Sequence, residues 1–159
     1  MTNIQILCVG KVKNSLWQPA VEEYTKRISR FSTVEITEVK EYSLPDQPSQ
    51  KQIENALHKE GQDLIGKKNK DSIGFALDSQ GKTLSSVDIA KLLEQYLKKQ
   101  SQSISFFIGS SYGLGSLILQ QYPSISFSKM TFPHQLCRVI LLEQIFRGFK
   151  ILAGESYHK

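Results

Sequence analysis

The sequence has few cysteines and no long apolar run. Its 159 residues include two cysteines, Cys8 and Cys137, both in apolar stretches, with no Cys-x-x-Cys pair and no Cys/His cluster. This excludes a disulfide scaffold, predicts no bound metal, and indicates the reduced cysteines of a cytoplasmic protein. Since no run of about 18 apolar residues occurs, we expect no membrane span. The first residues enter a strand-like run directly, without the architecture of a signal peptide.

Acidic residues are scarce at both ends of the chain. The net charge is +5, and residues 1–30 and 129–159 each carry five basic and two acidic side chains, whereas the middle carries ten basic and eleven acidic ones. If the two ends meet in space, they form one basic surface that could bind a phosphate backbone. The alternative is an ordinary solvated surface. Residues 100–128 contain no charge and no histidine, which indicates backbone buried near a ligand or a subunit partner.

Apolar residues alternate between strand-like and helix-like spacing along the whole chain. The pattern predicts strands at 4–9, 34–39, 72–77, 104–108 and 125–127, and helices at 17–28, 49–64, 85–97, 116–121 and 131–152. Ser49 with Gln52 and Ser85 with Asp88 are expected to form capping boxes. This order is typical of an α/β fold, a mostly parallel sheet flanked by helices, and we expect one domain over residues 1–159.

Loops after strands are the expected ligand site, because ligands of such sheets bind at the carboxyl ends of strands. Three loops qualify, at 78–82, 109–114 and 126–132. The segment 109–113 matches Gly-x-Ser-x-Gly, the nucleophile elbow of hydrolases, and Glu143 and His158 follow it in the order of a triad. The chain is short for that fold and lacks a glycine-rich oxyanion segment. A glycine turn that lets backbone approach a small ligand is the simpler interpretation, and labelling of Ser111 by a serine-directed probe would favour the hydrolase.

Residues 126–134 mix apolar side chains with backbone donors just before a helix. Such a loop can wrap a flat heterocycle and contact its edge with main-chain groups. The alternative is a simple strand-to-helix connection with Thr131 as N-cap, in which His134 is a capping or surface residue. The end of the chain places Tyr157, His158 and Lys159 together, which offers an aromatic ring for stacking, a titratable imidazole and a cation for phosphate.

The last predicted helix, 131–152, is apolar on more than one side. Val139, Leu142, Phe146 and Phe149 line one side, and other apolar residues line another: Leu136, Ile140 and Ile151. Such a helix must be buried on more than one side. We therefore expect it to contact a partner subunit as well as its own sheet, the alternative being a central core helix.

Several segments together resemble a known family. ILCVGKVK, LDSQGK, IGSSYGL and FSKMTFPHQLCRVILLEQIFRGFKILAGESYHK are similar to the SPOUT-class methyltransferases that modify a pseudouridine of 23S rRNA at N3, the ribosomal RNA large subunit methyltransferase H family. The resemblance covers the whole length. It implies a C-terminal deep trefoil knot that binds S-adenosyl-L-methionine, a homodimer, and a role in rRNA processing. The expected substrate is the assembled ribosome, with free rRNA and the large subunit as alternatives. A non-enzymatic ribosome-assembly factor that binds RNA is the alternative.

The resemblance also implies site residues. It places the cofactor against Leu77, Gly109, Phe127, Ser128, Lys129, Met130, Thr131 and Phe132. For the methyl transfer we expect Arg138 to supply positive charge, Tyr157 to position or stack on the base, and His158 to accept the N3 proton. One departure is Ser110, which stands where the family usually has a second glycine.

Overall fold

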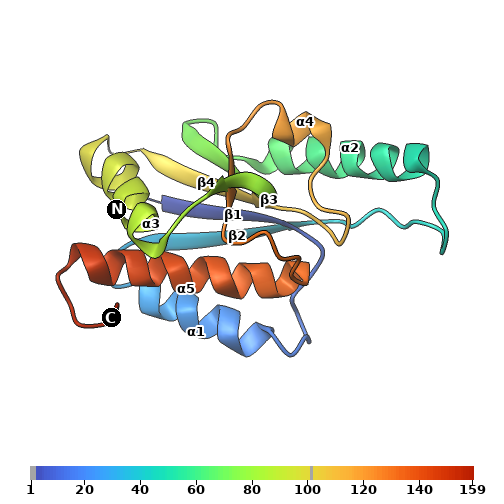
Figure 1. The fold of residues 1–159 in the computed structure, drawn as a ribbon. Helices are drawn as coiled ribbons and strands as arrows, with labels where there is room; N and C mark the ends of the chain where they lie inside the picture. Colours follow the sequence, from blue (N-terminus) through green and yellow to red (C-terminus); the bar gives the residue numbers. More distant parts are fainter. Residues whose placement is uncertain (1–2, 101) are drawn as a thin grey trace.

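The computed structural model describes residues 3–100 and 102–159 and is built on a five-stranded sheet of order β2-β1-β4-β3-β5 (Figure 1). Every pair of neighbouring strands is parallel, so the expected α/β fold with helices flanking a parallel sheet is confirmed. The strands are β1 (Asn3–Val9), β2 (Thr33–Val39), β3 (Ser72–Thr83), β4 (Ser103–Ile108) and β5 (Ser124–Ser126). The helices are α1 (Gln18–Ile28), α2 (Gln50–Lys67), α3 (Ser86–Leu93), α4 (Ser116–Leu119), α5 (His134–Leu152) and the π-helix η1 (Glu94–Lys99), which continues α3.

Helices cover both faces of the sheet. Figure 1 shows α1 and α5 on one side and α2 with α4 on the other. The central strand β1 divides its side chains between these faces: Ile4 and Ile6 join the core under α5, whereas Leu7 and Val9 join the core under α2. Successive side chains of a strand point to opposite faces, so a strand buried on both sides is apolar at nearly every position.

Two helices begin where the local sequence predicts. Ser49 accepts the backbone N–H of Gln52 and Ser85 accepts that of Asp88, and in each pair the second side chain accepts the first residue's N–H in return. Both predicted capping boxes are confirmed.

Strand β3 differs from the prediction. It does not end at Leu77 but runs on to Thr83, and both Leu77 and Lys82 pair with Ile125 of β5. The four residues 78–81 therefore bulge out between two paired segments of the same strand. The turn predicted at residues 78–81 is present, but the strand continues beyond it because Lys82 and Thr83 pair with β5. No local sequence pattern indicates this pairing.

The start of α5 also differs. The helix begins at His134, Pro133 is its N-cap, and no side chain caps it, so the expectation of Thr131 as N-cap is wrong. A proline disfavours helical backbone in the residue before it, so Phe132 stays outside the helix and the N-cap falls at Pro133, two residues later. The helix ends before Gly154, whose φ of +67° is the left-handed conformation that favours glycine.

The two basic ends of the chain lie side by side. Helix α1 packs along α5 (Figure 1), with the Tyr24 ring 6.4 Å from that of Phe146. The condition for one basic surface is thus met. Part of its charge is already paired, however, because Arg27 bonds Glu23 and Arg147 bonds Glu143.

Candidate functional site

A cavity of about 310 Å³ opens at the bulge of β3 and at the carboxyl ends of β4 and β5. Its walls come from three loops, 77–79, 108–114 and 125–132, with His134 and Cys137 of α5. The three loops expected from the strand pattern therefore meet in space. Of the residues that the resemblance places around a cofactor, Lys129 alone is absent from the lining: Leu77, Gly109, Phe127, Ser128, Met130, Thr131 and Phe132 are present. We call this the strand-end cavity.

The loop 126–132 is shaped by its own serines. Ser126 is buried; its hydroxyl donates to the carbonyl of Ser128 (2.8 Å) and accepts the Ser128 N–H (3.2 Å). Ser128 in turn accepts the N–H of Met130 (3.1 Å). Such short-range bonds hold a turn in one conformation without regular secondary structure. At the rim, Met130 is 68% exposed and Tyr112 is 49% exposed; large apolar groups at a cavity mouth are typical of a ligand site.

Gly109 is needed for the tight path of the 109–114 loop. A Cβ on Gly109 would lie 2.2 Å from the carbonyl oxygen of Gly113. The next residue, Ser110, forms a bridge with Gly113, whose N–H donates to the Ser110 carbonyl (2.8 Å). Ser110 is buried, and its φ is not positive. A side chain at this position is therefore compatible with the loop, despite the family's usual glycine.

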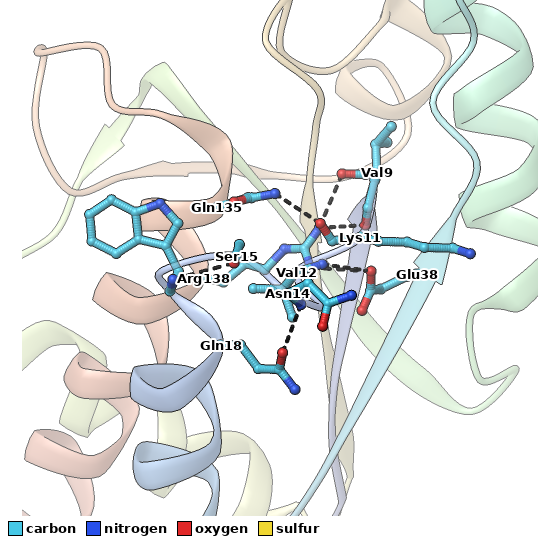
Figure 2. Close-up of polar contacts among 11 residues, drawn as sticks. Val9, Lys11, Val12, Asn14, Ser15, Gln18, Glu38, Gln135 and Arg138 are labelled. Carbon is cyan, nitrogen blue, oxygen red and sulfur yellow. Dashed lines mark hydrogen bonds and ion pairs between the residues drawn. The ribbon is translucent and has the colours of Figure 1, made fainter.

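Arg138 is fully buried and bonded to backbone. Its Nη2 donates to the carbonyls of Val9 (3.1 Å) and Gly10 (2.6 Å), and its Nη1 lies 3.5 Å from Oε2 of Glu38 (Figure 2). The same Glu38 oxygen accepts the N–H of Val12 (3.1 Å). Arg138 and Glu38 thus fasten the connection between β1 and α1.

This burial bears on the role expected of Arg138. Its Nε and Nη1 make no hydrogen bond to any described residue, and its side chain is 0% exposed. A buried guanidinium is costly where its N–H groups lack acceptors, and here the two carbonyls and the Glu38 carboxylate offset part of that cost. The guanidinium of Arg138 is enclosed by its own chain, and its expected contact with a substrate stays a prediction.

The C-terminal residues form what we call the tail cluster, on the second half of α5. The Tyr157 hydroxyl donates to Oε1 of Glu143 (3.2 Å), and its ring packs edge-on against Phe146 at 5.0 Å. The Arg147 guanidinium lies 4.7 Å from the Tyr157 ring centre and 3.4 Å from Nδ1 of His158. Burial, and then the Glu143 charge, raise the pKa of Tyr157, which keeps its phenol protonated.

Sequence reasoning missed Arg147 and Glu143 as members of this cluster. Their spacing of four residues on one helix face was a signal for an ion pair, and they bond at 2.6 Å. What the spacing could not show is that Tyr157 and His158 fold back onto that pair. Cys137 of the cavity wall stands six residues before Glu143 and ten before Arg147 on the same helix, so the cavity wall and the tail cluster are about 9 to 15 Å apart along α5.

This separation also decides against a triad within one chain. Ser111 lines the strand-end cavity, which contacts the first turn of α5. Glu143 and His158 belong to the tail cluster, which lies on the second half of that helix. The three groups of the hydrolase hypothesis are not brought together.

The two cysteines are free thiols in different settings. Cys8 lies in the core, and burial raises the pKa of its thiol to about 12. Cys137 is half-buried in the cavity wall, and desolvation raises its pKa as well. A thiol with a raised pKa is a poor nucleophile.

Residues 3–100 and 102–159 contain neither a metal-binding cluster nor a membrane-spanning helix. No group of three or more His, Cys, Asp or Glu side chains could hold a metal ion. None of the helices is long and apolar enough to cross a membrane.

A parallel sheet with a cavity at the carboxyl ends of its strands defines an α/β protein, a class in which small molecules bind at that edge of the sheet. A family model described as "Predicted SPOUT methyltransferase" matches residues 2–158, and the chain belongs to this family, whose members use S-adenosylmethionine. Among solved structures, TrmJ from Z. mobilis ZM4 is similar in fold, with a TM-score of 0.50 and 10% sequence identity over 92% of this chain and 69% of that chain.

Proposed function

We propose that this protein transfers a methyl group from S-adenosylmethionine to N3 of a pseudouridine in 23S rRNA, as a cytoplasmic homodimer acting on assembled ribosomes. The observation that carries the proposal is the strand-end cavity, in which the loops after β3, β4 and β5 gather seven of the eight residues expected to contact the cofactor. The finer substrate assignment follows the resemblance of the motifs, above all TFPHQ and the terminal YHK.

The cavity suits the proposed cofactor chemically. Leu77, Ile108 and Phe127 supply apolar walls for a flat heterocycle, while the turn at Gly109 brings backbone close to the ligand. Its volume of about 310 Å³ is at the lower end of the range for small-molecule sites. When bound, S-adenosylmethionine supplies a methyl group activated by its sulfonium.

Two observations support a dimer. Leu136, Ile140 and Ile151 are half-buried apolar residues of α5, on a side that also carries Arg147, and a second subunit would cover them. None of the tail-cluster residues lines the strand-end cavity of its own chain. In the proposed dimer, whose deep trefoil knots we expect from the resemblance, the tail of one subunit reaches the cofactor of the other.

The residues then divide the reaction between them. Tyr157 positions the target base, and Arg147 supplies the positive charge that lowers the proton affinity of N3. His158 accepts the N3 proton, directly or through water, as the new N–C bond forms and the methyl–sulfur bond breaks. In this proposal Arg138 is a positioning residue that holds the β1–α1 connection. Alignment of nucleophile and methyl group can supply about 7–11 kcal/mol of the acceleration.

The first test is calorimetric titration with S-adenosylmethionine, followed by tritiated methyl transfer onto ribosomes that lack the modification. We expect saturable binding and about one methyl group per ribosome, mapped to N3 of a pseudouridine. RNA binding by a folded dimer that does not bind S-adenosylmethionine would contradict the proposal and favour the assembly factor. Transfer to free 23S rRNA but not to ribosomes would overturn only the choice of substrate particle.

A mixing experiment tests the shared site. We expect His158→Ala to lose most turnover while binding S-adenosylmethionine normally, and Gly109→Val to lose the cofactor. Dimers reassembled from equal amounts of the two inactive variants should regain about a quarter of the wild-type activity, because half of them carry one intact composite site out of two. A site contained within one chain predicts no recovery, and unchanged turnover of His158→Ala removes His158 from the mechanism.

A further inference from the structure

A second cavity, of about 430 Å³, adjoins the strand-end cavity. It lies between the loop 41–46 that follows β2, the face of α2 that carries Leu57 and Glu60, and the loop after β4. Ser110 and Tyr112 line both cavities. The two cavities therefore lie against the same loop, and a ligand that occupied both would pass Ser110 and Tyr112.

Glu60 is the buried polar group of this second cavity. It is 3% exposed, and its Oε1 accepts the backbone N–H of Tyr42 (3.1 Å). Its Oε2 is buried and makes no hydrogen bond of normal geometry to any described residue. Burial raises the pKa of Glu60, and the Tyr42 N–H and the nearby Ser110 hydroxyl offset only part of that rise. A buried carboxylate oxygen without a donor is costly, so a donor from outside the chain would stabilise it.

The charges around Glu60 define which donor fits. Glu41 and Asp46 line the same cavity, and Asp63 accepts the hydroxyl of Tyr42 (3.1 Å). Lys40 and Lys59 lie 5.8 and 5.6 Å from the centre of the Tyr42 ring, and neither lines the cavity. Such a lining repels a phosphate and attracts a cationic N–H donor. We call this space the acidic cavity.

We propose that Glu60 binds the α-ammonium group of the methionyl part of S-adenosylmethionine at the junction of the two cavities. The inference rests on the proposed function, since it takes the adenosyl part to occupy the strand-end cavity. That cavity is small for the whole cofactor, whereas the acidic cavity next to it matches the charge of the ammonium end. Glu60 lies outside the three strand-end loops and outside every residue set that the motifs indicated.

The test compares three ligands that differ at the methionyl end. S-adenosylmethionine and S-adenosylhomocysteine carry the α-ammonium, and 5′-methylthioadenosine has the same adenosyl part without it. We expect Glu60→Gln to weaken binding of the first two by about 10- to 100-fold, as for loss of a charged hydrogen bond. Binding of 5′-methylthioadenosine should change less than about twofold. Glu54→Gln, which removes an exposed carboxylate from the same helix, is the matched control and should change none of the three.

Each other outcome overturns the inference. Equal weakening of all three ligands means that the variant disturbs the shared loop instead. Weakening of S-adenosylmethionine alone means that Glu60 senses the sulfonium and not the ammonium. If Glu60→Gln does not fold, Glu60→Asp retains the charge at a shorter reach, and it must weaken the two ammonium ligands selectively. Wild-type protein that binds none of the ligands contradicts the proposed function itself, whereas normal wild-type binding with an unchanged Glu60→Gln variant contradicts only this inference.

Discussion

Replacing Gly109 by valine is expected to weaken S-adenosylmethionine binding by about 10- to 100-fold while leaving the fold intact. The new Cβ would lie 2.2 Å from the Gly113 carbonyl oxygen and 2.8 Å from the Leu114 nitrogen. Backbone atoms cannot yield as a flexible side chain can, so the 109–114 loop must move out of the cavity wall that it forms. Overpacking of this kind costs about 1–3 kcal/mol, and each 1.4 kcal/mol lost from binding is tenfold in affinity.

Calorimetric titration measures the effect, and circular dichroism checks the fold. Gly66→Ala is the matched control, because a Cβ there meets nothing within 4 Å and the residue lies in α2, away from the loop. The control should bind the cofactor normally and unfold at a slightly higher urea concentration, since alanine favours helix over glycine. Normal binding by a folded Gly109→Val variant would show that the loop after β4 does not shape the cofactor site.

Replacing Arg138 by methionine is expected to lower the free energy of unfolding by about 3 kcal/mol. The substitution keeps most of the side-chain volume but leaves the Val9 and Gly10 carbonyls and the Glu38 carboxylate without their cationic donor. The Val9 and Gly10 carbonyls would lose their donor, and a polar group left unpaired in the interior costs about 1–3 kcal/mol. The Glu38 side chain is 26% exposed, so water can solvate its charge and it adds less to the loss.

Urea unfolding followed by tryptophan fluorescence suits this measurement, since Trp17 packs against the core beside the affected connection. Arg27→Met is the control, because it makes the same substitution at an arginine whose ion pair with Glu23 is exposed. The free energy of unfolding should fall much less in this variant. A similar fall in the free energy of unfolding for both variants would mean that the buried Arg138 stabilises the fold no more than an exposed arginine does. The alternative of a direct catalytic role predicts instead a stable Arg138→Met variant with low turnover.

The candidate site was predictable from the sequence because its position depends on local patterns. Apolar alternation locates the strands, and parallel strands end at one edge, so the loops after them meet there. Leu77, Gly109 and Phe127 all line the resulting cavity. The capping boxes at Ser49 and Ser85 were equally accessible, since donor and acceptor lie three residues apart.

Sequence reasoning reached less far where a residue's environment depends on distant segments. The prediction that β3 ends at Leu77 was wrong, because the strand continues beyond its bulge by pairing with β5. Nothing near Arg138 in the sequence indicates that its guanidinium binds the Gly10 carbonyl, 128 positions away, and nothing near Lys129 indicates that it lies outside the cavity lining. The roles expected of both residues stay predictions. Local periodicity assigns a residue to an element, not to the groups it will meet.

The sequence by itself determined the α/β class, the parallel order of elements, the three loops that line the strand-end cavity and the family, because these follow from short-range patterns and continuous motifs. Tertiary structure alone decided that Arg138 is buried, that Tyr157 and His158 fold back onto Glu143 and Arg147, and that Glu60 faces a second cavity. These properties arise from packing between segments far apart in the chain, where burial and charge are set by the neighbours that folding brings together.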